Sequence, residues 1–239
     1  MDREQMINLV VAAVVSSTVL SAIVTHLLYA RKLRKEQRIR SEGITGEKIV
    51  EALYKIRDIE LRCCEMKILE TEEWLSYGVG LDFFGGTLSY PTIMSSTESL
   101  DAFFDMINVA RREEERYLGY KTASYLSYME NYILQLVQYL HKNNLDESYP
   151  LAGYVIQKDF IDWQIRTEKN VVNAINSPKY KLSIHTGIKW IIMQKIVKRE
   201  LWNKSILNGL LNDSKDSKVK MAKAILSKDI DEVLRLSEQ

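Results

Sequence analysis

Residues 6–30 read MINLVVAAVVSSTVLSAIVTHLLYA and contain no Asp, Glu, Lys or Arg. At ~1.5 Å per residue, a helix of this length reaches about 37 Å, which is enough to cross a hydrocarbon core of ~30 Å with some tilt. A buried helix of a soluble protein is the alternative, but soluble helices of this length normally carry charges on a solvent-facing side. The stretch therefore predicts a single transmembrane helix.

The charges on either side of this stretch predict its orientation. Residues 1–5 form a short tail with two acidic side chains and one basic side chain, whereas the segment after the span is strongly basic. We expect the following residues at the cytoplasmic membrane interface: Arg31, Lys32, Arg34, Lys35, Arg38 and Arg40. Because excess Lys and Arg mark the cytoplasmic side, the tail should lie outside and the rest of the chain in the cytoplasm. A cleaved signal peptide would carry its basic residues before the apolar stretch, so we expect an uncleaved signal anchor in the cell membrane.

Small side chains recur every four residues within the predicted span. This spacing puts them on one helix face, as close helix–helix contact in lipid requires. The residues of this face are Ala13, Ser17, Ser21 and Thr25. Alternatively, the hydroxyl groups bond to backbone carbonyls one turn earlier in an isolated helix. Self-association of the span is therefore a hypothesis for this face.

The composition of the whole chain favours a helical protein. The 239 residues include 33 Lys and Arg and 32 Asp and Glu, so the net charge of +1 points to no particular partner. Acidic residues are in excess in 42–150 and basic residues in 179–239, and these regions either attract each other or bind different partners. With only 10 Gly and 3 Pro, an all-β sandwich is disfavoured. The two cysteines, Cys63 and Cys64, are too few for a disulfide scaffold or a four-cysteine zinc module, and we interpret them as core residues.

Two glycines separate the membrane region from the rest of the chain. Residues 31–46 form a basic juxtamembrane segment. Glycine costs ~1 kcal/mol relative to alanine inside a helix, so Gly43 and Gly46 predict a hinge. Beyond this hinge we expect a cytoplasmic helical domain at 47–212, followed by short C-terminal helices at 213–239.

Apolar residues recur with the helical period through the predicted domain. A helix that begins after Thr45 should end near residues 74–77, and Ser95–Glu98 has the pattern of a capping box at the start of the next helix. A later stretch has alternating spacings of four and three, as in a coiled-coil seam. The seam residues are Leu118, Thr122, Tyr125, Met129, Tyr132, Leu136 and Tyr139. A helix expected at 186–211 should carry the following residues on or near its buried side: Ile188, Ile191, Ile192, Ile196, Leu201 and Leu207.

The longest irregular connection is 78–95, GVGLDFFGGTLSYPTIMS. Gly80–Thr87 approaches the phosphate-loop pattern G-x-x-x-x-G-K-[ST] but lacks its lysine, so we do not expect nucleotide binding. The large side chains of this loop either fill the helical core or form an exposed partner site. They are Leu81, Phe83, Phe84 and Tyr90.

No residue pattern in the sequence indicates a catalytic or metal site. The three histidines are far apart and have no ligand spacing, and no nucleophile elbow, dinucleotide fingerprint or kinase motif occurs. We therefore expect no catalytic residue, no metal and no cofactor. Residues 179–223 combine basic and aromatic side chains, which is consistent with a solvated helix, with anionic-lipid binding or with nucleic-acid binding. The candidate basic surface comprises Lys189, Lys195, Lys198, Arg199 and Lys204.

These observations predict an all-α protein with a single N-terminal transmembrane helix, followed by a cytoplasmic multi-helix bundle with coiled-coil-like packing. Its composition, rich in Lys, Ile, Asn and Tyr, is compatible with a bacterial source. The expected function is interaction or oligomerisation through cytoplasmic helix faces, with the lipid bilayer and a second copy or another protein as partners. The alternatives are a membrane-tethered enzyme with a site assembled from scattered residues, and a tether that binds nucleic acid or anionic lipid through 179–223.

Overall fold

The computed structural model describes residues 43–68, 89–145, 148–176 and 187–237. The chain divides into two compact units, Met1–Glu47 and Lys48–Gln239, and the fold described below is that of the second unit. The predicted transmembrane helix, its small-residue face and the basic residues at 31–40 lie outside the described residues. Within the described ranges, no helix is both long and apolar enough to cross a membrane.

The described part of the chain is predominantly α-helical, which confirms the predicted all-α class. A helix covers residues 43–64, and its portion within the second unit is called the 48–64 helix below. The other elements, in chain order, are β1 (Met66–Ile68), β2 (Ser89–Pro91), η2 (Thr92–Met94), α3 (Thr97–Glu114), η3 (Glu115–Tyr117), α4 (Tyr120–Lys142), α5 (Tyr149–Asn176), α6 (Gly187–Glu200), η4 (Trp202–Lys204), α7 (Ile206–Leu211), α8 (Ser217–Leu226) and α9 (Ile230–Ser237).

A short antiparallel strand pair corrects the predicted end of the first helix. The helix ends at residue 64 rather than near 74–77, because the next residues pair with β2 in a register that sets Met66 opposite Pro91. The Glu65 carbonyl also accepts hydrogen bonds from the Thr92 backbone N–H, at 2.7 Å, and from the Thr92 hydroxyl, at 2.9 Å. These bonds replace those that a continuing helix would have made.

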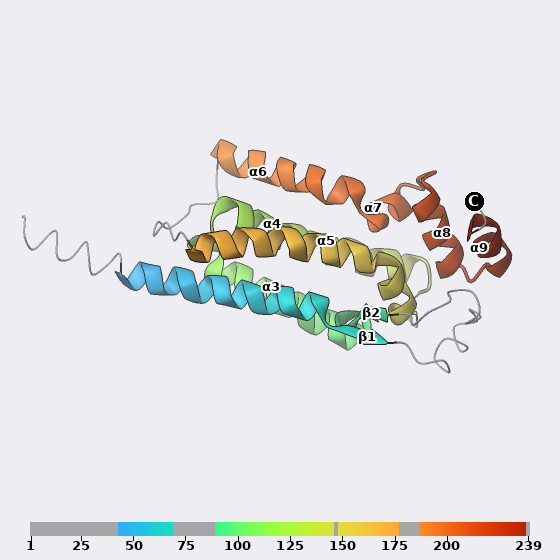
Figure 1. Ribbon diagram of the computed structural model, residues 1–239, viewed down its shortest axis with the longest axis horizontal. Helices are drawn as coiled ribbons and strands as arrows, with labels where there is room; N and C mark the ends of the chain where they lie inside the picture. The colour runs from blue at the N-terminus through green and yellow to red at the C-terminus, as the bar shows by residue number, and fades with distance from the viewer. Residues whose placement is uncertain (1–42, 69–88, 146–147, 177–186, 238–239) are drawn as a thin grey trace, which may run out of the picture. The chain divides into compact units, whose positions relative to one another are not determined.

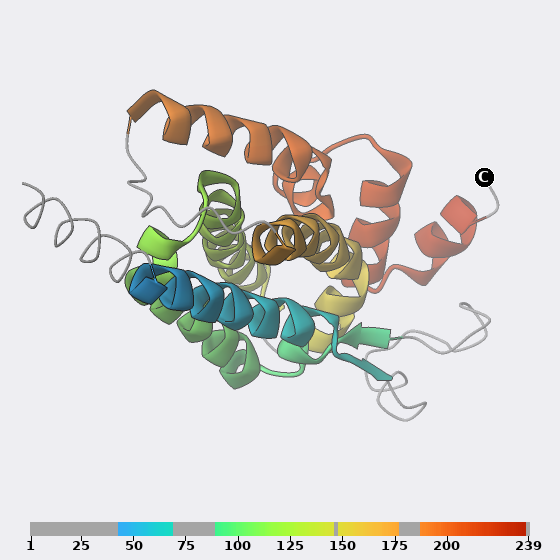
Figure 2. The same cartoon turned by 60° about the vertical axis from the view of Figure 1, so that its left-hand side comes forward.

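Helix α4 lies at the centre of the unit. It packs against α3, α5 and α6, and both views show the 48–64 helix and α3 on one side of α4 and α5, with α6 on the other (Figures 1 and 2). The predicted seam residues are buried, apart from Tyr139, which is half-buried. Every residue from Thr122 to Met129 is buried, so this part of α4 is enclosed on all sides, more fully than in a two-helix seam.

Two local features fix the ends and crossings of the helices. The Ser96 side chain accepts a hydrogen bond from the Ser99 backbone N–H, at 3.2 Å, and caps α3, so the cap lies one residue later than Ser95. Helix α5 crosses β2 and η2 at Gly153, where an added Cβ would lie 2.6 Å from the Met94 Cβ. Only glycine permits this close approach.

Candidate functional site

The inner face of α6 is held to the core by a polar network at its C-terminal end. The Tyr125 hydroxyl donates a hydrogen bond to Glu200 Oε2, at 2.8 Å, and Arg166 Nη1 lies 3.6 Å from the same oxygen. The Trp163 indole N–H donates to the Tyr125 carbonyl, at 2.8 Å. Burial raises the pKa of Tyr125, so its hydroxyl stays protonated and remains a donor. These contacts tie α6 to α4 and α5.

A second buried network fixes the helix that follows α6. The Asp159 carboxylate on α5 accepts a hydrogen bond from the Tyr132 hydroxyl, at 2.8 Å. It also accepts bonds from the backbone N–H groups of Ile206, at 2.9 Å, and Leu207, at 3.1 Å, which are otherwise unpaired donors at the start of α7. Burial raises the pKa of Asp159 to about 6 despite these bonds. Asp159 is therefore a structural group that joins α4, α5 and α7.

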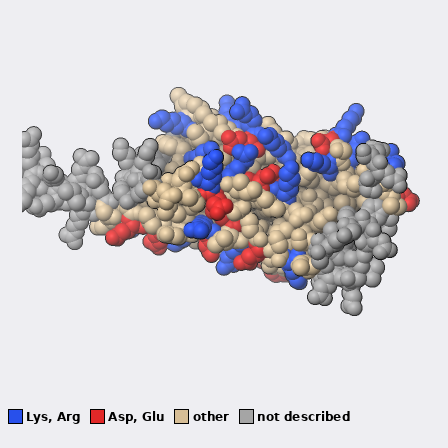
Figure 3. Space-filling model, in the orientation of Figure 1, with Lys and Arg blue, Asp and Glu red and all other residues tan. Residues whose placement is uncertain are grey.

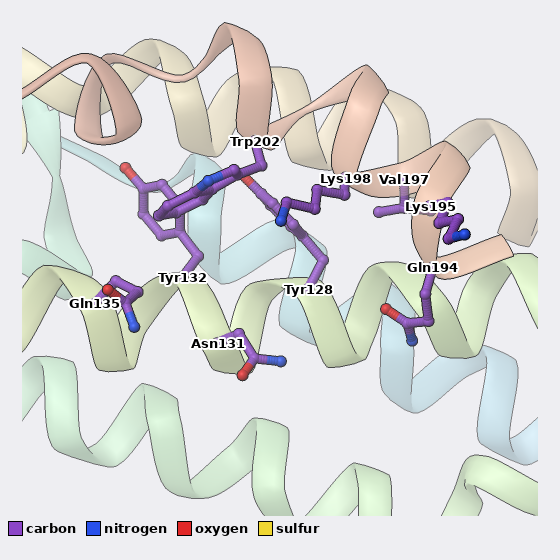
Figure 4. Close-up of a pocket in the computed structure, with 9 residues that line it drawn as sticks. All are labelled: Tyr128, Asn131, Tyr132, Gln135, Gln194, Lys195, Val197, Lys198 and Trp202. Carbon is purple, nitrogen blue, oxygen red and sulfur yellow. The ribbon is translucent and has the colours of Figure 1, made fainter. Parts of the chain in front are cut away.

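A cavity of about 480 Å³ lies between α4, α6 and η4. Figure 4 shows the rings of Tyr132 and Trp202 close together above α4, with Tyr128 beside them and the Lys198 side chain extending toward Tyr128. The Tyr132 ring meets the Trp202 ring edge-on at 6.4 Å between centroids. The complete lining is Tyr128, Asn131, Tyr132, Gln135, Gln194, Lys195, Val197, Lys198 and Trp202.

The chemistry of this cavity suits binding rather than acid–base catalysis. Its lining contains amides, lysines and aromatic rings but no Asp, Glu, His or Cys. Burial raises the pKa of both Tyr128 and Tyr132, so neither hydroxyl ionises near neutral pH to act as a base. The lysine amines and the amide groups of the lining can make polar contacts, and the aromatic rings can make apolar ones.

The outer face of α6 carries isoleucines that the sequence analysis assigned to its buried side. Ile188 is 76% exposed, Ile191 54% and Ile192 47%, so this assignment was wrong for these three residues. The reason is that the opposite face, which includes the fully buried Val197, contacts the core. The residues of the predicted basic surface are all exposed: Lys189, Lys195, Lys198, Arg199 and Lys204.

Helical spacing arranges part of this face into a continuous surface. A helix turns by ~100° per residue, so positions 188, 191, 192, 195 and 199 fall on one side. We call these residues the α6 stripe: Ile188, Ile191, Ile192, Lys195 and Arg199. Its N-terminal half is apolar and its C-terminal half is basic, and all five side chains are exposed.

A groove of about 680 Å³ lies between the 48–64 helix and α3. The residues that line this acidic groove are Glu51, Tyr54, Lys55, Asp58, Ile59, Ala102, Asp105, Met106, Val109, Ala110, Glu113 and Glu114. Five of them are acidic and one is basic, and the basic Lys55 is already paired with Glu114. Figure 3 shows basic side chains along the edge that α6 occupies in Figure 1, and acidic ones, with basic ones among them, along the edge of the 48–64 helix.

Tyr90 is the member of the predicted loop site that lies within the described residues. Tyr90 lies in β2, is 2% exposed and packs near Gly153, whereas Leu81, Phe83 and Phe84 lie outside the described residues.

The cysteines are both free, and burial raises the pKa of both thiols, with Cys63 fully enclosed. Within the described ranges, no three His, Cys, Asp or Glu side chains are grouped to hold a metal ion.

Sequence reasoning did not anticipate the buried networks or the groove. Each joins residues from separate helices, for example Tyr125 and Glu200, and no local pattern encodes that pairing. The sequence does show that α6 has apolar residues on two faces, and this feature could have indicated that one of them is exposed.

No protein-family model matches the chain, and comparisons with curated proteins and with solved structures also find no match.

Proposed function

We propose that this chain is a single-pass membrane protein that binds other proteins, including copies of itself, through its cytoplasmic helix faces. Residues 6–30 form the anchor, with the N-terminus outside and the unit Lys48–Gln239 in the cytoplasm. The charge-free stretch and the basic residues that follow it support this topology.

The main observation behind this proposal is the exposed α6 stripe. A helix held at its inner face by Val197 and by the Tyr125–Glu200 bond still presents three isoleucines to solvent within about one turn and a half. Single exposed apolar residues are common on protein surfaces, but a cluster on one helix face marks a contact surface. Complete burial of one isoleucine contributes about 1.5–3 kcal/mol, so covering the cluster would stabilise a complex substantially.

Crosslinking in native membranes tests whether the stripe mediates association. Full-length chains with two different tags are co-expressed, crosslinked with an amine-reactive reagent and recovered through one tag. Ile191→Ser should reduce the recovered adducts about fivefold or more, since an exposed anchor of the complex is lost. Ile165→Ser on α5 is the matched control, because Ile165 is 55% exposed and Ile191 54%. Equal losses in both variants, or none in either, would contradict the proposal.

The anchor is tested separately. We expect the full-length chain to stay with membranes after an alkaline wash, and a C-terminal tag to be protected from protease added outside intact cells. Release of the chain by the wash, or digestion of the tag, would overturn the topology.

A second candidate function is binding to anionic lipid through the same helix. The interleaving of Ile188, Ile191 and Ile192 with exposed lysines favours it, since this composition is typical of helices that lie in a membrane interface. Binding to phosphatidylglycerol vesicles that falls as salt rises, and that Ile191→Ser weakens, would support this function.

A further inference from the structure

We propose that the α6 stripe of one copy docks into the acidic groove of a second copy, so that chains associate head to tail. This inference rests on the proposed function and names its partner and both contact surfaces. It would make the chain self-complementary, with one basic and one acidic surface in each copy.

The two surfaces do not satisfy each other within one chain. The α6 stripe is exposed, and so are most residues on the rim of the groove. Figures 1 and 2 place α6 on one side of the α4 and α5 pair and the 48–64 helix with α3 on the other. The α6 stripe and the rim of the groove are therefore both accessible to a partner.

The charges of the two surfaces are complementary. Glu51 and Asp58 lie on one wall of the groove, Asp105 and Glu113 lie on the other, and all four side chains are exposed. On the first wall, Glu51 lies 3.6 Å from Lys55 and Asp58 lies 3.7 Å from Arg62, so the charge-reversal test below uses the α3 wall. Lys195 and Arg199 supply the opposite charge on the stripe, with Lys189 and Lys198 exposed beside it. The one acidic residue of α6, Glu200, is bonded to Tyr125 on the inner side. Such complementarity steers association and disfavours contact between two like surfaces.

The apolar parts and the lengths of the two surfaces also match. Between its acidic walls the groove presents Tyr54, Met106 and Val109, of which Tyr54 and Val109 are more than half exposed. From position 188 to 199 the stripe extends about 16 Å, and the α3 wall from 102 to 113 extends the same distance. The apolar end and the basic end of the stripe can therefore both contact one groove, as when an amphipathic helix binds in a groove.

A second copy explains both surfaces, whereas a membrane would explain only one. An anionic bilayer would attract the basic half of the stripe but repel the acidic groove, which would still lack a partner. In a head-to-tail pair, the copy whose groove is filled still has a free stripe, and the copy whose stripe is docked still has a free groove. Such heterologous contacts continue into open chains or close into rings.

Charge reversal tests the pairing directly in the full-length chain in its membrane. Lys195→Glu/Arg199→Glu on the stripe should reduce adducts between chains about tenfold, and Asp105→Lys/Glu113→Lys in the groove should do the same. Co-expression of the two variants should restore adducts between chains that carry different tags. The unaltered stripe of the groove variant then meets the unaltered groove of the stripe variant, and the two altered surfaces also carry opposite charges. Lys142→Glu/Lys169→Glu, at two exposed lysines elsewhere, is the control that should leave adducts unchanged.

Engineered cysteines test the geometry. Chains with Ile191→Cys and chains with Val109→Cys should form a disulfide-linked adduct when co-expressed and mildly oxidised, whereas neither should form one alone. Chains without an added cysteine supply the background from the native thiols. An Ile191→Cys adduct with itself would overturn the proposal in favour of a symmetric α6–α6 contact.

The remaining outcomes separate this inference from the proposed function. If Ile191→Ser reduces crosslinking but mutual charge reversal does not restore it, the head-to-tail contact is wrong and association through α6 stands. If neither change affects crosslinking, both are wrong. If Lys195→Glu/Arg199→Glu abolishes binding to phosphatidylglycerol vesicles and leaves the adducts unchanged, the partner of the stripe is lipid and the inference is overturned.

Discussion

Helices α4 and α6 show how similar sequence patterns lead to different environments. Both carry apolar residues at helical spacing, but α4 is enclosed by its neighbours from Thr122 to Met129, whereas α6 exposes the cluster around Ile191. The difference arises because α4 lies between other helices, whereas α6 contacts the core through one face only. Periodicity thus predicts that a helix has an apolar face, but not whether this chain or a partner covers it.

The largest loss of stability is expected when one core residue of α4 is truncated. Leu136 is fully buried, so Leu136→Ala should lower the free energy of unfolding by about 2–5 kcal/mol, through lost burial and the cavity left behind. Denaturant titration of the purified full-length protein in detergent measures this change. A loss below about 1 kcal/mol would contradict the assignment of α4 as the central helix.

The sequence indicates the buried face of a helix correctly where the helix has one apolar face, and it fails where a helix has two. On the 48–64 helix, apolar residues at helical spacing, including Leu53, Ile56 and Ile59, are buried, because this helix has one dominant apolar face. The end of that helix was wrong, since the β1–β2 register depends on residues far along the chain. On α6, two faces are apolar, and long-range contacts such as Tyr125 with Glu200 select the inner one. The groove has no local signature, because its walls come from separate helices.

A buried carboxyl group on the 48–64 helix should make stability depend on pH. Both Glu60 carboxyl oxygens are buried without a hydrogen-bond partner among the described residues, and burial raises the pKa of Glu60 from 4.5 to about 8. As pH rises between these values, the unfolded chain releases the proton while the folded chain retains it, so the free energy of unfolding falls. Between pH 6 and 8 the loss should be about 2 kcal/mol.

Glu60→Gln isolates this effect. The amide does not titrate, so the variant should show a flatter stability profile between pH 6 and 8, measured by denaturant titration at each pH. Asp159, whose pKa is raised to about 6, titrates mainly below this window and is unchanged in the variant. Parallel profiles for the two proteins would show that Glu60 is not the titrating group.

The hydrogen bond that attaches the inner face of α6 to α4 should contribute less to the free energy of unfolding than the core packing of α4 does. Tyr125→Phe removes the hydroxyl that donates to Glu200 and leaves that carboxylate with Arg166 at 3.6 Å. We expect the free energy of unfolding to fall by about 1–2 kcal/mol, which is at the low end for a hydrogen bond to a charged group because the carboxylate is partly exposed and keeps Arg166. Tyr54→Phe, at an exposed tyrosine of the groove, should change stability little and serves as the control. Indistinguishable midpoints for the two variants would show that this bond does not hold α6.

The smallest effect on stability should come from the outer face of the same helix. Ile191 is exposed in the single chain, so Ile191→Ser should change the free energy of unfolding by no more than about 0.5 kcal/mol. The same substitution should strongly reduce association, whereas Leu136→Ala is expected to act mainly on folding. Denaturant titration at a low protein concentration, where chains are separate, measures the first quantity, and crosslinking in membranes measures the second. A large loss of stability in separate chains would mean that Ile191 packs within its own chain, and the distinction between a core helix and a contact helix would then fail.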